Sequence, residues 1–212
     1  MHLTYLAIVL STLAASPASA PAPAGGKARE GRSQCEAYLA THDVAVAAEL
    51  RALAKAPEDA LMAIASDTKA EGLIRARAVA ALRLVPTVGV RVFLGKLVSA
   101  KAKATDATDR LIVRRAAVAL GWMAVGVDTV EQLAALFDND DVEVRLDAAI
   151  ALGLTRATTA AKFLHRQLAV EQSPRVREQI DRQLRTLGEA AAEPDKAPAA
   201  PKKEQPPMRS GW

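Results

Sequence analysis

The chain has 212 residues, of which 50% are hydrophobic and 25% are charged, a composition typical of a folded globular protein. Aromatic residues make up only 3% while alanine and leucine are abundant, which argues against a β-sandwich or β-barrel and predicts an all-α fold. The formal net charge is +4, but residues 35–188 hold 21 Lys and Arg against 19 Asp and Glu. Because nucleic-acid binders usually carry a clustered basic surface, this near balance disfavours a nucleic-acid partner.

The N-terminal segment has the pattern of a secretory signal peptide. An apolar run from Leu3 to about Leu13 is followed by small residues that end in Ala18-Ser19-Ala20, an A-x-A cleavage site. The alternative is an uncleaved membrane anchor, but the run is shorter than the roughly 20 residues that a spanning helix needs. We therefore expect residues 1–20 to direct export, to a periplasm or out of the cell, with no membrane span after cleavage. Residues 21–34 are expected to form a flexible linker.

A pattern of apolar residues recurs along the chain. Counted from position zero, residues at 0, +4, +7 and +8 are Ile74, Ala78, Ala81 and Leu82, then Ile112, Ala116, Ala119 and Leu120, then Val144, Ala148, Ala151 and Leu152. A fourth copy starts at Val176, with Gln183 at +7, and the four starts are 38, 32 and 32 residues apart. These offsets share one face of an α-helix, and alanine there lets a neighbouring helix approach closely. Each copy is therefore predicted to be a packed helix.

The sequence leaves room for another helix before each copy. The segments 57–65, 88–98, 128–137 and 158–170 carry apolar residues at helical spacing. Helix starts are marked by four capping signals: Thr68 with Glu71, Asp128 with Glu131, Asp140 with Glu143, and Ser173 before Pro174. The repeating unit is thus predicted to be a helical hairpin of about 32 residues.

The motif VRLDAAIALG at 144–153, preceded by FDNDD, resembles the second helix of a HEAT repeat, of the short bacterial subclass first noted in phycobilin lyases. IRARAVAALR at 74–83 and IVRRAAVALG at 112–121 resemble it too, so the similarity covers residues 57–187. The resemblance implies a right-handed α-solenoid of about four to five hairpins, whose second helices line the concave side. It also implies that Arg75, Arg145 and Arg177 bond to neighbouring turns. Val113 replaces the arginine in the second copy, so this ladder is expected to be broken there.

The sequence also predicts where the repeats end. Positions +5 to +7 are apolar in the first three copies but are Asp181, Arg182 and Gln183 in the fourth, which is typical of a terminal repeat with a polar outer face. The array should end near Leu187, and the Pro/Ala/Lys-rich residues 189–212 should form a disordered tail. Within the repeat domain, 35–188, residues 35–56 match the template poorly and are expected to be an N-terminal cap or a degenerate repeat.

We expect no catalysis, cofactor or metal site. His42 and His165 lack further converging ligands and are expected on the surface or in packing contacts. Cys35 lies seven residues before His42, about 10 Å along a helix, which is too far for a direct hydrogen bond. The simplest interpretation of Cys35 is a free thiol; in an oxidising compartment the alternative is a disulfide between two chains.

Three features have competing interpretations. The acidic stretch at 138–141 suggests calcium binding, but it lacks the later glycine and glutamate of an EF-hand, so a turn with helix capping is simpler. The spacing of 38 residues between the first two copies adds six residues within 99–110. These residues form either a recognition loop or a long loop that the fold tolerates. Trp122 is either a core residue or an exposed anchor for a partner.

These observations favour an exported, non-catalytic scaffold that binds a protein or peptide along the concave face of its second helices. The candidate contacts are charged residues of those helices beside the apolar template: Arg77, Arg114, Arg115, Asp147 and Arg182. The alternative is an accessory or lyase-like protein with a small ligand in the groove. Reversing the charges of Arg114 and Arg115 together is expected to weaken partner binding and to leave the thermal melt unchanged.

Overall fold

The computed structural model describes residues 25–123 and 126–192. All regular secondary structure in these residues is helical, so the prediction of an all-α fold is confirmed. The predicted signal peptide, 1–20, and residues 193–212 of the predicted tail lie outside the described residues. Within the described ranges, no helix is long and apolar enough to cross a membrane.

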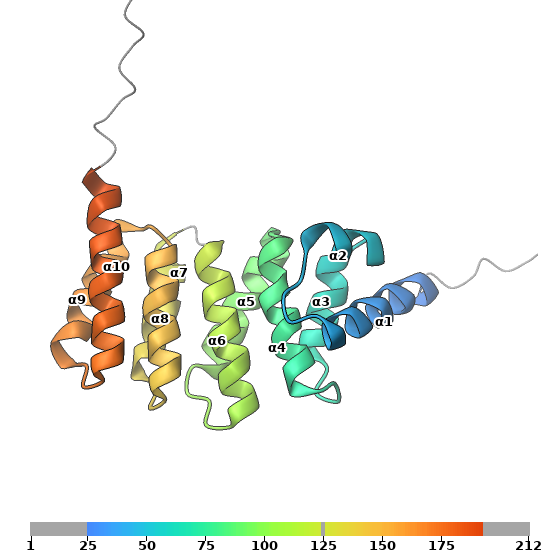
Figure 1. Ribbon diagram of the computed structural model, residues 1–212, viewed down its shortest axis with the longest axis horizontal. Helices are drawn as coiled ribbons and strands as arrows, with labels where there is room; N and C mark the ends of the chain where they lie inside the picture. The colour runs from blue at the N-terminus through green and yellow to red at the C-terminus, as the bar shows by residue number, and fades with distance from the viewer. Residues whose placement is uncertain (1–24, 124–125, 193–212) are drawn as a thin grey trace, which may run out of the picture.

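The helices form two layers. In chain order they are α1 (Gly25–Thr41), α2 (Ala47–Leu53), α3 (Pro57–Ser66), α4 (Gly72–Ala81), η1 (Leu82–Leu84), α5 (Val88–Lys101), α6 (Ala107–Trp122), α7 (Val127–Ala134), η2 (Ala135–Asp138), α8 (Val142–Leu154), α9 (Thr158–Val170) and α10 (Pro174–Ala192). Neighbours pack on one another within the A layer (α3, α5, α7, α9) and within the B layer (α4, α6, α8, α10). Figure 1 shows the B helices side by side with α5, α7 and α9 behind them, the general arrangement of an α-solenoid.

Each A helix packs against the B helix that follows it. The A helices overlap the four segments predicted before the template copies, with residues 135–137 of the third segment in η2. The B helices carry the template, with Leu82 in η1. The template residues that are buried are Ala78, Ala81, Leu82, Ile112, Ala116, Ala119, Leu120, Val144, Ala148, Ala151, Leu152, Val176 and Ile180. Where Gly121 of α6 faces α8, an added Cβ would lie 2.6 Å from the carbonyl oxygen of Ala151. Small residues on the template face therefore set the spacing of the B layer.

The capping predictions were wrong at two helices and displaced at a third. Neither α4, which follows Glu71, nor α7, which follows Gly126, has a side-chain cap. Gly126 has φ +106°, a conformation that side-chain-bearing residues rarely adopt, so no capping residue fits there. Asp141, and not Asp140, caps α8 by accepting hydrogen bonds from two backbone N–H groups. Asp106, which was not predicted, caps α6 in the same way.

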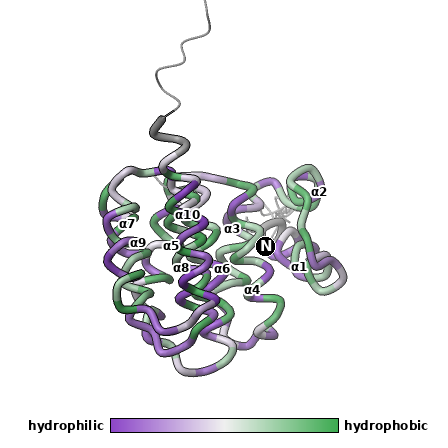
Figure 2. The backbone as a smooth tube through the Cα atoms, turned by 60° about the vertical axis from the view of Figure 1, so that its left-hand side comes forward, coloured by the Kyte–Doolittle hydropathy of each residue, from purple (hydrophilic) through white to green (hydrophobic). Residues whose placement is uncertain are grey.

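The domain boundaries also differ from those expected. Residues 25–34, predicted as part of a flexible linker, belong to α1, because Cys35 and Leu39 on the same helix are buried against the first hairpin. At the other end α10 continues through 189–192, which were expected in the tail. Figure 2 shows α1 and α2 on the opposite side of α4 from α7 and α9. α1 packs on α3 and α4, and its end and the connection to α2 help to form the site described next.

Candidate interaction surface

Equivalent stripes of side chains run along the B helices. Template positions −1, +3, +6 and +10 share one helix face because they are three or four residues apart. On α4 and η1 they are Leu73, Arg77, Ala80 and Leu84, and on α6 they are Leu111, Arg115, Val118 and Trp122. On α8 the same positions are Glu143, Asp147, Ile150 and Leu154. The face is therefore apolar and basic on the first two B helices and becomes acidic on the third.

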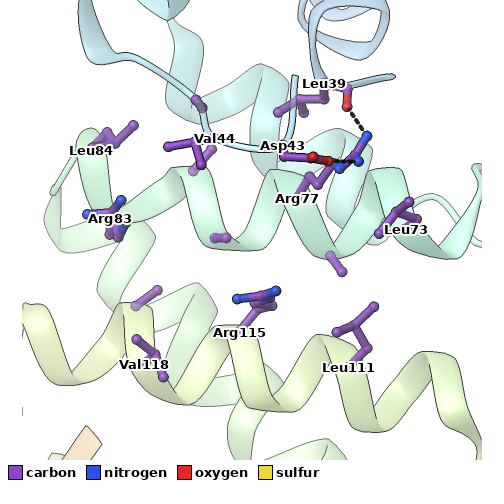
Figure 3. A pocket seen from close by; sticks show the side chains of 15 residues that line it. Leu39, Asp43, Val44, Leu73, Arg77, Arg83, Leu84, Leu111, Arg115 and Val118 are labelled. Atoms are coloured by element: carbon purple, nitrogen blue, oxygen red, sulfur yellow. Dashed lines mark hydrogen bonds and ion pairs between the residues drawn. The ribbon is translucent and has the colours of Figure 1, made fainter. Parts of the chain in front are cut away.

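A groove of about 390 Å³ lies between α4 and α6. Its remaining side is formed by the end of α1 and the connection to α2, where Val44 is 69% exposed. In Figure 3, Leu73 and Leu111 lie at one end of the groove, and Leu84 and Val118 lie at the other. An exposed apolar groove of this kind is typical of a binding site, since covering it removes apolar surface from water.

Arginines lie at the centre and the rim of the groove. Arg77 donates hydrogen bonds to the carbonyl oxygens of Leu39 (2.9 Å) and Ala40 (3.2 Å) and pairs with Asp43, so its charge holds the end of α1 on α4. Arg115 is exposed and lies between Leu111 and Val118. Arg115 is therefore accessible to a partner, while Arg77 has a role within the chain.

Two more of the predicted contact residues are engaged within the B layer. Arg114 donates to Asp147 (2.7 Å) and to Glu143 (3.1 Å), and Arg175 pairs with Glu143 from the next B helix. Burial raises the pKa of Asp147, and the neighbouring Arg114 opposes this rise. Arg114, Asp147, Glu143 and Arg175 therefore link α6, α8 and α10. Arg114 and Asp147, which were predicted to contact a partner, are engaged within the chain instead.

The fifth predicted residue lies away from the groove. Arg182 is exposed on α10, where it bonds to Glu178 and Gln179 of its own helix. Conversely, Arg83 is an exposed residue that lines the groove and was not predicted from the sequence. Arg83 stands nine residues after its template start, where the second and third copies have glycine. That departure from the repeat was the available signal.

The arginine ladder follows the interpretation taken from the resemblance. Arg75 donates to the carbonyl of Ala65 (3.3 Å), Arg145 to those of Asn139 and Asp140 (2.9 Å each), and Arg177 to those of Leu168 (2.7 Å) and Glu171 (3.1 Å). In α6 the buried Val113 stands in place of the arginine, so the arginine ladder is interrupted there as predicted. Arg110 spans this gap, because it donates to the carbonyl of Ala104 (3.4 Å) and to Asp141 (3.0 Å). Through these carbonyl contacts Arg75, Arg145 and Arg177 each fasten a B helix to the A helix or turn that precedes it in the same hairpin.

Glu171 is the most deeply buried carboxylate among the described residues, with 1% of its side chain exposed. It accepts two hydrogen bonds from Arg145 (2.9 Å each), one from Gln167 (2.8 Å) and one from the Ser173 N–H (2.9 Å). Burial alone would raise its pKa, but these donors outweigh burial and lower the pKa from 4.5 to about 2. Because both oxygens are bonded, Glu171 fastens the fourth hairpin and has no oxygen left for proton transfer.

The acidic stretch and the long segment form one structural feature. Asn139 is buried, donates to the carbonyl of Ala102 (2.7 Å) and accepts from the N–H of Asp141 (2.8 Å). The interpretation as a turn with helix capping is therefore confirmed. Most of 99–110 extends α5 and α6, and the turn between them is held by Asn139 and Arg110. These contacts favour the tolerated long loop over a recognition loop.

Cys35 and His42 lie apart in environment as well as in sequence. Cys35 is fully buried, and burial raises the pKa of its thiol, so a disulfide between two chains would require α1 to open. His42 is exposed and stacks on Tyr38 with ring centroids 4.3 Å apart. Among the residues that the structure describes, no group of three or more His, Cys, Asp or Glu side chains is placed to hold a metal ion.

Trp122 is exposed, so its interpretation as a core residue is wrong. Trp122 is 59% exposed and borders a hollow of about 330 Å³ together with Arg83, Val88 and Arg91.

Comparison of the chain with protein-family models, with curated proteins and with solved structures found no match.

Proposed function

We propose that the chain is an exported, non-catalytic HEAT-type scaffold that binds a protein or peptide partner in the groove between α4 and α6. In this proposal the hairpins form a right-handed solenoid of about four to five repeats, with the B helices on its concave side. The observation that carries the proposal is the groove itself, where apolar side chains and Arg115 remain exposed. Elsewhere on the B layer, Arg114, Asp147 and Arg175 are occupied by contacts within the chain.

The chemistry of the lining favours binding over catalysis. The ionisable groups lining the groove are Asp43, Arg77, Arg83 and Arg115, and the carboxylate among them is paired with Arg77. Arginine stays protonated and therefore makes a poor general base, whereas it suits recognition of carboxylates. Each leucine or valine that a partner covers would add roughly 1.5–3 kcal/mol if its burial were complete.

Site-specific photocrosslinking tests the proposal. A photoreactive residue replaces Val118 in the groove of the full chain, and a matched variant carries it at the exposed Val92 of α5, in the A layer. Both variants are expressed in the native cells. We expect a discrete polypeptide adduct from position 118 that is absent from position 92 and is weakened by Arg115→Glu. No polypeptide adduct from position 118, or the same adducts from both positions, would overturn the proposal.

Export is tested by sequencing the N-terminus of the mature protein. Cleavage after Ala20 should leave Pro21 as the first residue of protein recovered from the cell envelope or medium. Recovery from the cytosol with residues 1–20 intact would contradict this part of the proposal and leave the groove unaffected.

The groove volume also supports the alternative of an accessory or lyase-like protein with a small ligand. Small-molecule sites occupy roughly 300–1,000 Å³, and the groove, at about 390 Å³, falls within this range. Native mass spectrometry of the full chain purified from its own cells distinguishes the two. A bound small molecule that is lost in Arg115→Glu would favour the alternative, whereas the mass of the polypeptide alone would favour a macromolecular partner.

A further inference from the structure

We infer that the partner segment is an acidic peptide with apolar anchor residues, lying along α6 from the groove to Trp122. The inference rests on the proposed function and adds the chemistry of the partner and its path. It is carried by three observations: a continuous stripe on α6, a surplus of arginine along it, and exposed apolar residues between the arginines.

The groove and the hollow at Trp122 adjoin each other at Arg83. Leu111, Arg115, Val118 and Trp122 are spaced by four, three and four residues, so they share one face of α6. Arg83 lines both the groove and the hollow and thus stands between them. The stripe is about 16 Å long at a rise of about 1.5 Å per residue, which matches roughly five residues of extended peptide.

The charge along this path favours carboxylates. The path is lined by Arg77, Arg83, Arg91 and Arg115, together with a single carboxylate, Asp43. Because Asp43 pairs with Arg77, three arginines remain to face the partner. Arginine recognises carboxylates through charge-assisted hydrogen bonds, and complementary charge also speeds association.

The apolar residues on the path distinguish a peptide from a simple polyanion. Val88 is 67% exposed and Trp122 is 59% exposed in the hollow, and Leu84 and Val118 border the adjoining end of the groove. Aromatic residues beside arginine are frequent energetic anchors of protein interfaces. A nucleic-acid duplex, which presents its phosphates, would leave these apolar side chains uncovered, whereas a peptide that alternates apolar and acidic residues would cover both kinds of group.

Defined peptide pools test the inference. Four pools of fluorescein-labelled peptides of equal length are compared. The first combines apolar with acidic residues, the second apolar with basic residues, the third apolar residues with Asn and Gln, and the fourth small polar with acidic residues. Binding of each pool to the full chain is measured by fluorescence anisotropy. We expect the apolar-acidic pool to bind at least about tenfold more tightly than the others, and added salt to weaken it. Arg115→Glu and Arg83→Glu should each reduce this affinity about tenfold or more. The matched control is Arg166→Glu, at an exposed position on α9, and should change it less than twofold.

Trp122 supplies a direct readout of the path. The only other tryptophan is Trp212, so Trp212→Phe leaves Trp122 as the single tryptophan, which can be excited selectively at the red edge of its absorption. The apolar-acidic pool should shift the Trp122 emission, and Trp122→Ala should weaken binding about tenfold. A folded Trp122→Ala variant with unchanged affinity, together with no shift in emission, would overturn the path to Trp122.

The outcomes separate this inference from the proposed function. Equal binding of all apolar pools, or tighter binding of the basic pool, would overturn the acidic peptide while a groove-specific crosslink still supported the scaffold. Binding of the small polar acidic pool, or of duplex DNA, as tight as that of the apolar-acidic pool would instead indicate a general anion site. Binding of no pool would also overturn the inference, whereas loss of the Val118 crosslink would overturn the proposed function.

Discussion

Glu171→Gln should destabilise the protein strongly at neutral pH and weakly in acid. The substitution keeps the shape of the side chain and removes the charge that Arg145 contacts at 2.9 Å. A carboxyl pKa lowered from 4.5 to about 2 corresponds to about 3 kcal/mol of stabilisation of the folded state. With 1% of the side chain exposed, solvent screening of this interaction is small.

The sign of the pH dependence follows from the direction of the shift. Because the pKa is lower in the folded protein, the stabilisation is fully present above about pH 5 and is lost as the pH falls toward 2. The difference in unfolding free energy between the wild type and Glu171→Gln should therefore be about 3 kcal/mol at pH 7. It should fall to about 2 kcal/mol at pH 3.5 and to about 1 kcal/mol at pH 2.5.

Urea denaturation followed by circular dichroism measures this difference at each pH. Glu178→Gln is the matched control, because Glu178 also pairs with an arginine but its side chain is 73% exposed. An exposed pair of this kind should be worth less than about 1 kcal/mol at any pH. A Glu171→Gln effect below about 1 kcal/mol at pH 7, or one that stays constant down to pH 3.5, would refute the argument.

Two further predictions concern the packing and charges of the B layer. Gly121→Ala should destabilise by about 1–3 kcal/mol, because the added Cβ would lie 2.6 Å from the backbone oxygen of Ala151. Gly188→Ala, where nothing lies within 4 Å, should be neutral or stabilising by up to about 1 kcal/mol; equal effects of the two in urea melts would contradict the close approach. Arg114→Ala should lower the unfolding free energy by about 1–3 kcal/mol, because it leaves the largely buried Asp147 without its partner. Arg115→Ala should stay within about 0.5 kcal/mol, and a larger effect for Arg115 than for Arg114 would reverse their assignment.

The contacts of Arg114 also change what is expected when the charges of Arg114 and Arg115 are reversed together. From the sequence, reversing Arg114 and Arg115 together should leave the melt unchanged. In the structure Arg114 bonds to Glu143 and Asp147, so the double variant would lose stability whether or not a partner binds. Arg115→Glu alone is therefore the informative substitution in the groove.

The sequence by itself determined the helices and their packed faces. Apolar residues at 0, +4, +7 and +8 have a period that only an α-helix places on one face, so the four hairpins were predictable from spacing. The burial of the alanines followed as well, because they are small and occupy that face. The start of the folded domain was less predictable. α1 begins within a Gly-rich and charged stretch that is typical of linkers, and its position depends on contacts with α3 and α4, which lie further along the chain.

The tertiary structure decided which charged residues are available to a partner. Arg114 and Arg115 are neighbours in sequence, but successive residues of a helix point about 100° apart, so one reaches α8 and the other faces the groove. Nothing in the local pattern says which neighbour a helix will have on each side. For the same reason the burial of Glu171 and the exposure of Trp122 could not be predicted from the sequence, since both depend on how the adjoining helices are placed.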